Sequence, residues 1–339
     1  MSCVAPIRIG VLGVGRIGRM HAAMLARDVP GLSLAAVHDT DEEAAAAVAR
    51  ELGVPATPSS CDLIERPDVD AVAICSSTDT HVDLVVEAVP SGKPLFLEKP
   101  VSLELAEVDR ALDAVSEGGV FLQLGLNRRF DPAHRSVRHA VESGALGGLH
   151  LVRITSRDPE PPPLDYIRVS GGMFLDMTVH DLDLARFVTG SEVDEVYARG
   201  EVRVDPTIGE AGDLDTVVVM LRHADGTLTV IDNSRRAAYG YDQRLEAFGA
   251  NGMAASGNPP EHTGFALTGD GFRGTVLPHF FLERYRTSYI AAWASFERSV
   301  RGGSSPSVTG VDGRRALVLG LAARRSATEG RPVRVAEIG

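Results

Sequence analysis

From Ile7 onward the chain alternates short apolar runs with amphipathic stretches, and no other feature constrains its fold as strongly. Apolar runs of this length are typical of buried strands, and the amphipathic stretches between them are typical of helices. Such alternation builds a parallel sheet with right-handed crossovers, so we predict a doubly wound N-terminal domain. Its expected strands are 7–12, 32–37, 71–75, 94–97 and 120–124, and its expected helices are 17–27, 41–52, 81–89 and 103–116.

The pattern changes after Asn127. Longer alternating runs are now separated by turn signals such as Ala224-Asp225-Gly226, which favours antiparallel or mixed pairing. Expected strands are 149–156, 195–204, 216–221, 227–234 and 244–248, and expected helices are 132–142, 284–301 and 311–328. We therefore predict an α/β protein with a Rossmann domain over 1–127 and a second α/β domain over 128–339. The second domain has a large, open, mostly antiparallel sheet, and its C-terminal segment can pack back on the first domain.

The loop after the first expected strand carries the pattern G-x-G-x-x-G. Gly13 permits a tight turn, Gly15 lets the backbone approach a pyrophosphate, and Gly18 lets the helix pack on the strand. Asp39 ends the second strand, 21 residues after Gly18, where an acid binds the ribose hydroxyls of NAD. This context disfavours the alternative, a glycine-rich turn with a chance acid. The NAD-binding set expected here is Gly13, Gly15, Arg16, Ile17, Gly18 and Asp39.

Glu98-Lys99-Pro100 follows the strand 94–97, at the sheet edge where open α/β folds bind ligands. Pro100 cannot continue the ladder and can hold a cis bond that aims Lys99 at the nicotinamide. From these residues alone, a solvated surface Glu–Lys pair is the better explanation. His81, after the strand 71–75, either contacts the cofactor or is simply an early helix residue. The expected cofactor-binding set gains Ser76, Thr78, His81, Glu98 and Lys99 at this edge.

The block 171–183 carries Asp176, His180 and Asp183 at i, i+4 and i+7. A helix that begins near residue 173 places all three on one face. A carboxylate one turn from an imidazole can orient it and stabilise its protonated form. Two alternatives remain: an N-capping aspartate beside a histidine that packs on the sheet, and a metal site. No further His or Cys cluster completes a metal site, so we expect none.

Composition excludes several classes of function. The chain has 34 basic and 46 acidic residues, a net charge of −12, whereas nucleic acids and anionic membranes demand a basic face. Apolar runs reach about eight residues, against roughly 20 for a membrane span. Cys3, Cys61 and Cys75 form neither a disulfide framework nor a zinc ligand pair, and the strand pattern at Ile7 leaves no room for a signal peptide. We expect a cytoplasmic protein that binds neither nucleic acid nor membrane.

Taken in order, the glycine pattern, Thr78-x-x-His81, Glu98-Lys99-Pro100 and the block 171–183 resemble the Gfo/Idh/MocA oxidoreductases. These are nicotinamide-dependent enzymes that act on sugars, cyclitols and related polyols. The resemblance covers nearly the whole chain. The segments 127–131, 156–159 and 239–242 look most like the bacterial inositol 2-dehydrogenases of that family. The resemblance implies a Rossmann domain with an open-sheet α/β domain, NAD as cofactor, no metal, and a place in inositol catabolism.

The resemblance also implies roles for individual residues. It assigns catalysis to Lys99, Asp176 and His180. The implied substrate-binding residues are Asn127, Arg128, Asp158, Asp176, His180 and Tyr239, with Asp183 beside them. Members of the family vary at positions 127 and 158, which leaves the exact polyol open.

These roles predict NAD-dependent oxidation of myo-inositol or a close isomer to the inosose. We expect His180 to act as base, Asp176 to orient it, and Lys99 to stabilise alkoxide charge. Three alternatives remain: a dehydrogenase of another sugar or polyol, an enzyme that keeps its cofactor bound, and a non-catalytic NAD-binding sensor. The strand 216–221 has apolar residues on both faces, which predicts sheet-to-sheet packing in a homodimer or homotetramer.

Overall fold

The computed structural model describes residues 5–339, and their contacts divide the chain into two compact units. The first unit comprises the residues up to Leu126 together with 289–314, and the second comprises 127–288 and 315–339. The predicted second domain covered 128–339, with a C-terminal segment that can pack back on the first domain. Residues 289–314 belong to the first unit, because Trp293 and Phe296 are buried in its apolar core.

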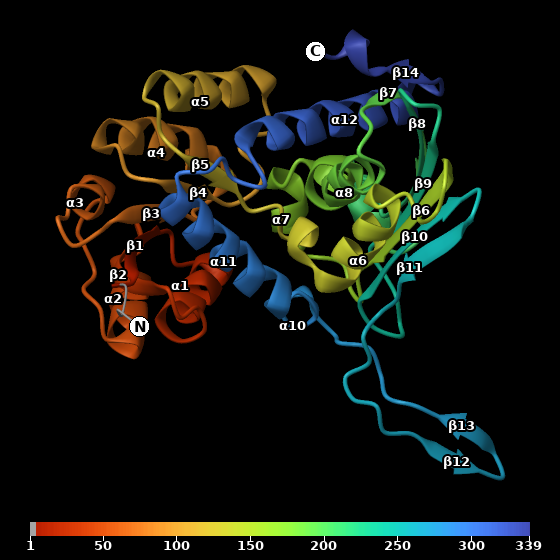
Figure 1. Cartoon of the computed structure of the whole chain (residues 1–339), viewed down its shortest axis with the longest axis horizontal. Helices are drawn as coiled ribbons and strands as arrows, with labels where there is room; N and C mark the ends of the chain where they lie inside the picture. Colours follow the sequence, from red (N-terminus) through yellow and green to blue (C-terminus); the bar gives the residue numbers. More distant parts are fainter. Residues whose placement is uncertain (1–4) are drawn as a thin grey trace. The chain divides into compact units, whose positions relative to one another are not determined.

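The first unit is built on a five-stranded parallel sheet in the order β2-β1-β3-β4-β5, which confirms the predicted Rossmann architecture (Figure 1). Its strands are buried on both faces because their sequences are almost wholly apolar. The strands are β1 (Ile7–Leu12), β2 (Leu32–His38), β3 (Ala71–Ile74), β4 (Leu95–Leu97) and β5 (Leu122–Leu124). The helices are α1 (Arg16–Arg27), α2 (Glu42–Leu52), α3 (Ser60–Ile64), α4 (His81–Ala88), α5 (Leu105–Glu117) and most of α11 (Arg286–Gly302).

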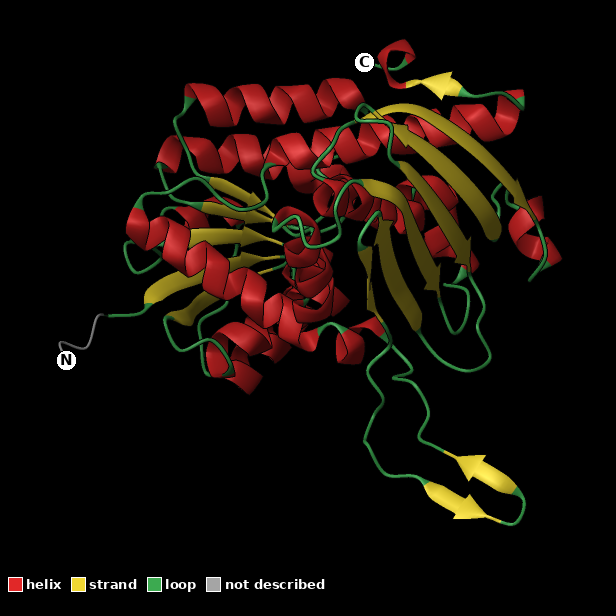
Figure 2. Ribbon diagram, turned by 45° about the vertical axis from the view of Figure 1, so that its right-hand side comes forward, coloured by secondary structure: helices red, strands yellow, loops and turns green. Residues whose placement is uncertain are grey.

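The second unit contains a mixed seven-stranded sheet in the order β11-β10-β6-β9-β8-β7-β14, seen as the broad twisted set of strands in Figure 2. Its strands pair antiparallel, apart from the parallel pair β6–β9. This confirms the predicted mostly antiparallel sheet. The strands are β6 (Leu149–Arg157), β7 (Val193–Glu201), β8 (Thr216–His223), β9 (Leu228–Ser234), β10 (Asp242–Gly249), β11 (Gly252–Ser256) and β14 (Val333–Arg334). The helices are α6 (Pro132–Glu142), α7 (Leu164–Val169), α8 (Val179–Thr189), α9 (Pro206–Glu210), α10 (Phe281–Arg284) and most of α12 (Gly310–Glu329).

The two faces of this sheet differ. Helices α6, α8 and α12 cover one face, where Val137, Leu182 and Leu319 join the inward side chains of the strands in a single core. On the opposite face, large apolar side chains remain 39% to 51% exposed. We call this set the outer apolar patch; it consists of Val218, Met220, Leu228, Phe248 and Met253.

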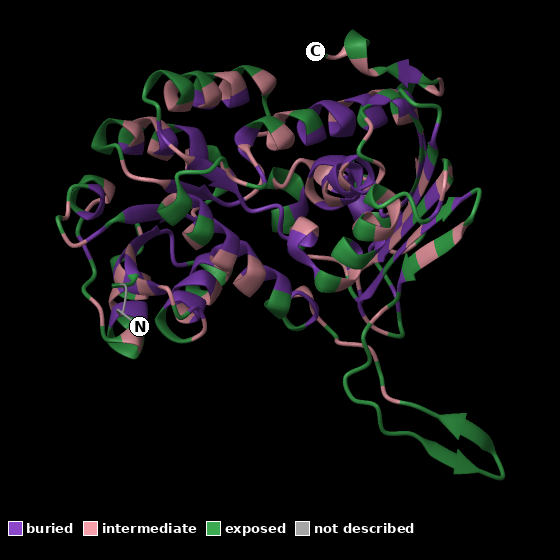
Figure 3. Cartoon of the chain, in the orientation of Figure 1, coloured by how far each residue is buried: buried purple, intermediate pink, exposed green. Residues whose placement is uncertain are grey.

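A two-stranded hairpin stands apart from the seven-stranded sheet, and the sequence did not predict it. It consists of β12 (Ala266–Thr268) and β13 (Gly271–Arg273), whose residues are all exposed (Figure 3). Phe265 and Phe272 stack across it with their ring centroids 5.7 Å apart.

Two further findings concern the described residues. None of their helices is long and apolar enough to cross a membrane. Cys61 and Cys75 are free thiols, while Cys3 lies outside the part of the chain that the structure describes.

Candidate active site

The glycine loop between β1 and α1 has the geometry of a phosphate cradle. Gly13 has a φ of 86°, a region that favours glycine. A Cβ atom on Gly18 would lie 1.8 Å from the carbonyl oxygen of Gly13, so the helix can approach the strand only without a side chain there. The space beside Gly15 is open to 4 Å, and no side chain caps α1. The amide groups at this helix end can therefore receive a pyrophosphate, as NAD requires.

Asp39 follows β2 and lies beside this loop. Its carboxylate accepts the N–H of Val14 at 2.7 Å and the N–H of Asp41 at 2.9 Å. These bonds hold the carboxylate at the edge where the glycine loop begins. Of the other predicted loop residues, Arg16 is exposed and Ile17 is partly exposed.

The loop after β3 contains Ser76, Thr78 and His81, but the three are placed differently. Ser76 and Thr78 are partly exposed, whereas His81 is only 1% exposed. The ring nitrogens of His81 lie 2.7 Å from the carbonyl oxygen of Pro100 and 3.2 Å from that of Ser76. Burial lowers the pKa of His81, so the ring is neutral near pH 7. We propose that His81 holds Pro100 rather than the cofactor.

Glu98-Lys99-Pro100 follows β4, and the Lys99–Pro100 peptide bond is cis, which the sequence allowed. Lys99 is partly exposed, but Glu98 is only 8% exposed. The Glu98 carboxylate accepts from His21 at 2.8 Å and from the backbone N–H of Lys99 at 3.1 Å. The solvated Glu–Lys pair that the sequence alone favoured is therefore incorrect, because Glu98 is buried within the first unit.

Asp176 and His180 belong to the second unit. Residues 174–178 form one π-helical turn that runs directly into α8, where the sequence predicted a continuous helix. Such turns are frequent at functional sites. One oxygen of Asp176 accepts from the hydroxyl of Tyr166 at 2.8 Å, and the other lies 3.5 Å from Arg235. Both Asp176 and His180 are partly exposed, as residues that meet a ligand must be.

Asp183 does not share the environment of Asp176. It is 2% exposed, and its carboxylate accepts two hydrogen bonds from Arg129, at 2.6 and 2.8 Å. Arg186 lies 3.6 Å from the same carboxylate. Asp183 is therefore part of a buried ion pair, whereas the predicted spacing had grouped it with Asp176 and His180.

Asp158 follows β6 and is only partly exposed. Burial, with the nearby charge of Asp176, raises the pKa of Asp158 to about 6 despite the guanidinium of Arg235. The carboxyl group thus titrates near neutral pH and lies within electrostatic reach of Asp176. The structure brings these two predicted site residues into one environment.

Of the three other predicted substrate residues, Arg128 and Tyr239 have partners within the chain. Asn127 is 4% exposed and begins a short turn of helix. Arg128 is 5% exposed and donates to Asp181 at 2.5 Å and to Ser156 at 2.8 Å. Tyr239 is 52% exposed, donates its hydroxyl to Asp242 at 2.6 Å and accepts from Arg157 at 3.0 Å.

Sequence reasoning missed Arg235 and Asp213. Arg235 is 1% exposed and lies 3.5 Å from both Asp176 and Asp213. Asp213 in turn accepts the N–H of Met173 at 2.9 Å, just before the π-helical turn. The one signal for Arg235 was its place directly after a predicted strand. Asp213 stands in a loop with no pattern that marks it.

Family comparisons match the two parts of the chain separately. The oxidoreductase family with an NAD-binding Rossmann fold matches residues 7–126, and the GFO/IDH/MocA C-terminal domain matches residues 134–255. The chain belongs to the GFO/IDH/MocA oxidoreductase family. As a member of this family it is an NAD-dependent oxidoreductase, and its first unit is the NAD-binding Rossmann domain.

Members of the GFO/IDH/MocA family resemble the chain over its whole length. The myo-inositol 2-dehydrogenase of Thermotoga maritima is 50% identical over 333 residues, which cover 98% of this chain and 99% of the relative. The myo-inositol dehydrogenase of Corynebacterium glutamicum has a TM-score of 0.93 and 41% identity, with 97% and 98% of the two chains covered. The scyllo-inositol dehydrogenase of Lactobacillus casei, solved with NAD(H) and scyllo-inositol, has a TM-score of 0.91, 29% identity and coverages of 98% and 99%.

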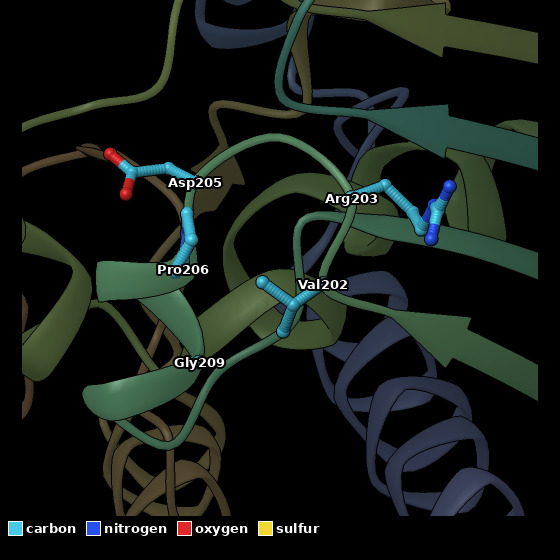
Figure 4. A pocket seen from close by; sticks show the side chains of 5 residues that line it. All are labelled: Val202, Arg203, Asp205, Pro206 and Gly209. Carbon is cyan, nitrogen blue, oxygen red and sulfur yellow. The ribbon is translucent and has the colours of Figure 1, made fainter.

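A separate cavity of about 370 Å³ opens between the end of β7 and α9 (Figure 4). It is lined by Val202, Arg203, Asp205, Pro206 and Gly209, none of which belongs to the predicted site. Within residues 5–339, no group of three His, Cys, Asp or Glu side chains could hold a metal ion.

The raised pKa of Asp158 predicts a pH-dependent stability. A carboxyl group that binds its proton more tightly in the folded state destabilises the folded protein once it ionises. Asp158→Asn is therefore expected to raise the unfolding free energy at pH 8 by about 1 to 3 kcal/mol, and this gain should vanish by about pH 4. Thermal unfolding of both proteins between these pH values measures the difference. A gain that stays constant with pH would contradict the assigned pKa.

Proposed function

We propose that this protein oxidises a cyclitol, myo-inositol or a close isomer, to the corresponding inosose. The observation that carries the proposal is the shared polar environment of Asp158 and Asp176 in the second unit, combined with an NAD-binding first unit. A cyclitol has a hydroxyl on every carbon and needs a pocket lined by polar groups. Relatives named inositol dehydrogenases, with up to 50% identity, support the same substrate class.

In the proposed reaction, NAD supplies the acceptor for the hydride that leaves the carbinol carbon. His180 accepts the hydroxyl proton, because an imidazole titrates near working pH. Lys99 stabilises the negative charge that develops on the oxygen as the proton leaves. The C–H and O–H bonds break and the C–O bond becomes a C=O bond: the hydrogen on carbon leaves as a hydride with two electrons for the cofactor, and the hydroxyl proton goes to His180.

Asp176 is proposed to orient His180 and to accept a substrate hydroxyl. Support comes from its own fixed position, since Tyr166 donates to one of its oxygens and Arg235 lies beside the other. Asp158 is proposed as a second acceptor for substrate hydroxyls. Asn127, Arg128 and Tyr239 stay in the proposed substrate set on the family resemblance, although Arg128 and Tyr239 have partners within the chain.

The substrate proposal predicts turnover of an inositol. We expect myo-, scyllo- or chiro-inositol to drive NADH formation more efficiently than glucose or galactose, as measured by the kcat/KM of each. Efficient oxidation of a simple aldose with no inositol turned over would contradict the proposed substrate class. If the purified protein shows the absorbance of NADH before any NAD is added, the enzyme keeps its cofactor bound.

We also propose a homodimer or homotetramer that buries the outer apolar patch. Five large apolar side chains on one sheet face are each at least 39% exposed, and apolar side chains gathered on one face mark interaction surfaces more often than single exposed ones do. Two copies related by a two-fold axis would cover the patch with itself.

Sedimentation at micromolar concentration is therefore expected to give the mass of two or four chains. Met220→Glu, which introduces a charge into the patch, is expected to lower the assembled fraction at least about tenfold. Val169→Glu is the matched control, because Val169 is apolar and 71% exposed but lies outside the patch. A single-chain mass for the unmodified protein would contradict the proposal.

A further inference from the structure

A buried histidine in the first unit has no role in the function proposed above. His21 lies on α1, three residues after Gly18, and is 0% exposed. It is surrounded by aromatic rings, with centroids 5.3 Å away at Phe96, 5.5 Å at Tyr289 and 5.6 Å at Trp293. An apolar side chain would fill such a site at lower desolvation cost, so the two nitrogens of the imidazole need an explanation.

The partners of His21 determine which nitrogen carries the proton. The indole N–H of Trp293 lies 2.9 Å from Nδ1 of His21, and an indole nitrogen can only donate. Nδ1 is therefore the acceptor, and in the neutral ring Nε2 carries the hydrogen. That N–H donates to Oε1 of Glu98 at 2.8 Å.

The second oxygen of Glu98 extends this chain to Lys99. Oε2 accepts the backbone N–H of Lys99 at 3.1 Å, so both carboxylate oxygens are engaged. A Cβ atom on Gly125 would lie 2.9 Å from the carboxylate, which shows how closely the end of β5 packs against it. On the far side of Lys99, the carbonyl of Pro100 is held by His81 at 2.7 Å.

We infer that His21 and Glu98 are positioning residues for Lys99. A continuous series of hydrogen bonds, which we call the line, begins at Trp293 on α11. It passes through His21 and Glu98 and ends at the backbone N–H of Lys99. Because His21 lies on the helix that starts at the glycine loop, the line also fixes Lys99 relative to the phosphate-binding end of α1. The inference rests on the proposed role of Lys99, and it deepens that role by naming the groups that hold the lysine in place.

Substitutions at Glu98 and His21 test the inference through kcat. Glu98→Gln keeps the size but presents an N–H to one of the two donors, so one bond of the line is lost. We expect kcat to fall about tenfold to a hundredfold, with the KM values for substrate and NAD within about threefold. His21→Leu should have the same effect, whereas His21→Gln retains a donor near the Nε2 position and should recover most of the kcat.

The matched control is His223→Gln in the second unit. His223 is 0% exposed and has partners on both nitrogens, Ser191 at 3.0 Å and Thr229 at 2.9 Å. The kcat of His223→Gln is expected to stay within about twofold of the unmodified enzyme, because these partners of His223 lie outside the line that reaches Lys99. Thermal unfolding of every variant identifies those that lose activity by unfolding. Equal losses in kcat for His21→Gln and His21→Leu, in folded proteins, would overturn the inference.

A double-mutant cycle separates this inference from the proposed function. If Glu98 acts through Lys99, adding Glu98→Gln to Lys99→Ala should lower kcat no further. A Lys99→Ala enzyme with full kcat would overturn the proposed role of Lys99 itself. A strong effect of Lys99→Ala with none for Glu98→Gln would overturn only the positioning role. The chain has one tryptophan, so one indole resonance reports the bond to His21, and its exchange should accelerate in His21→Leu.

Discussion

His180→Ala is expected to lower kcat by at least about a hundredfold while leaving the dissociation constant of NAD nearly unchanged. The reason is that the imidazole is the proposed acceptor of the hydroxyl proton and belongs to the second unit, whereas the NAD-binding loop belongs to the first. Lys99→Ala is expected to cause a loss of similar size, because it removes the cation proposed to stabilise the developing alkoxide. NADH formation gives kcat, and calorimetric titration gives the affinity for NAD.

The matched control for this experiment is His139→Ala. His139 is an exposed histidine on α6 in the same unit, and its removal should leave kcat within about twofold. A His180→Ala enzyme that keeps most of its kcat would remove His180 from the mechanism. The imidazole would then be a packing residue on α8, one of the alternatives that the sequence left open.

The second large effect concerns the choice of cofactor. We expect NAD to be preferred over NADP by at least about a hundredfold in kcat/KM, equivalent to roughly 2.7 kcal/mol. Asp39 is fixed beside the glycine loop by the N–H of Val14, where its carboxylate can accept the ribose hydroxyls. A 2′-phosphate at this place would bring two negative charges together. The following residues, Thr40-Asp41-Glu42-Glu43, add acid and no cation.

Asp39→Ala should reduce the preference for NAD over NADP, mainly by lowering the kcat/KM for NAD. Glu42→Ala removes an exposed charge of the same sign three residues further on and should change the preference by less than about threefold. Steady-state kinetics gives the kcat/KM for NAD and for NADP in the unmodified enzyme, Asp39→Ala and Glu42→Ala. Comparable kcat/KM for NADP in the unmodified enzyme would show that Asp39 does not face the ribose, or that Arg16 receives the phosphate.

Sequence patterns predicted the elements whose local signals are unambiguous. β1 and α6 have the predicted bounds, because β1 is a continuous apolar run and α6 starts at an Asp131-Pro132 cap. The predicted helix 284–301 is interrupted at Tyr285, which ends α10 just before α11 begins at Arg286. The ring of Tyr285 is fully buried there. The hairpin β12–β13 was missed because its strands are three residues long and flanked by glycines.

The contacts within the site could be predicted less well than its residue types. Asp176 and His180 were marked by their spacing, and Asp39 by its distance from the glycines. The pairs Arg128–Asp181 and Arg129–Asp183 join residues 53 and 54 positions apart, and nothing in the local sequence distinguishes which acid each arginine selects. The π-helical turn at 174–178 likewise depends on tertiary packing, since its sequence suits an ordinary helix.

The burial of Trp293 in the first unit has a consequence for the order of events during synthesis. Trp293 bonds to His21 across 272 positions of sequence, so the ribosome makes residues 127–288 of the second unit before it can deliver this residue. Until then Phe96 lacks the indole that stacks on it at 4.2 Å. The N-terminal sheet must therefore persist on the nascent chain with an unfilled apolar surface, the condition under which nascent chains rely on chaperones. A fragment that ends at Leu126 is accordingly expected to aggregate on release, although every strand of the parallel sheet is present in it.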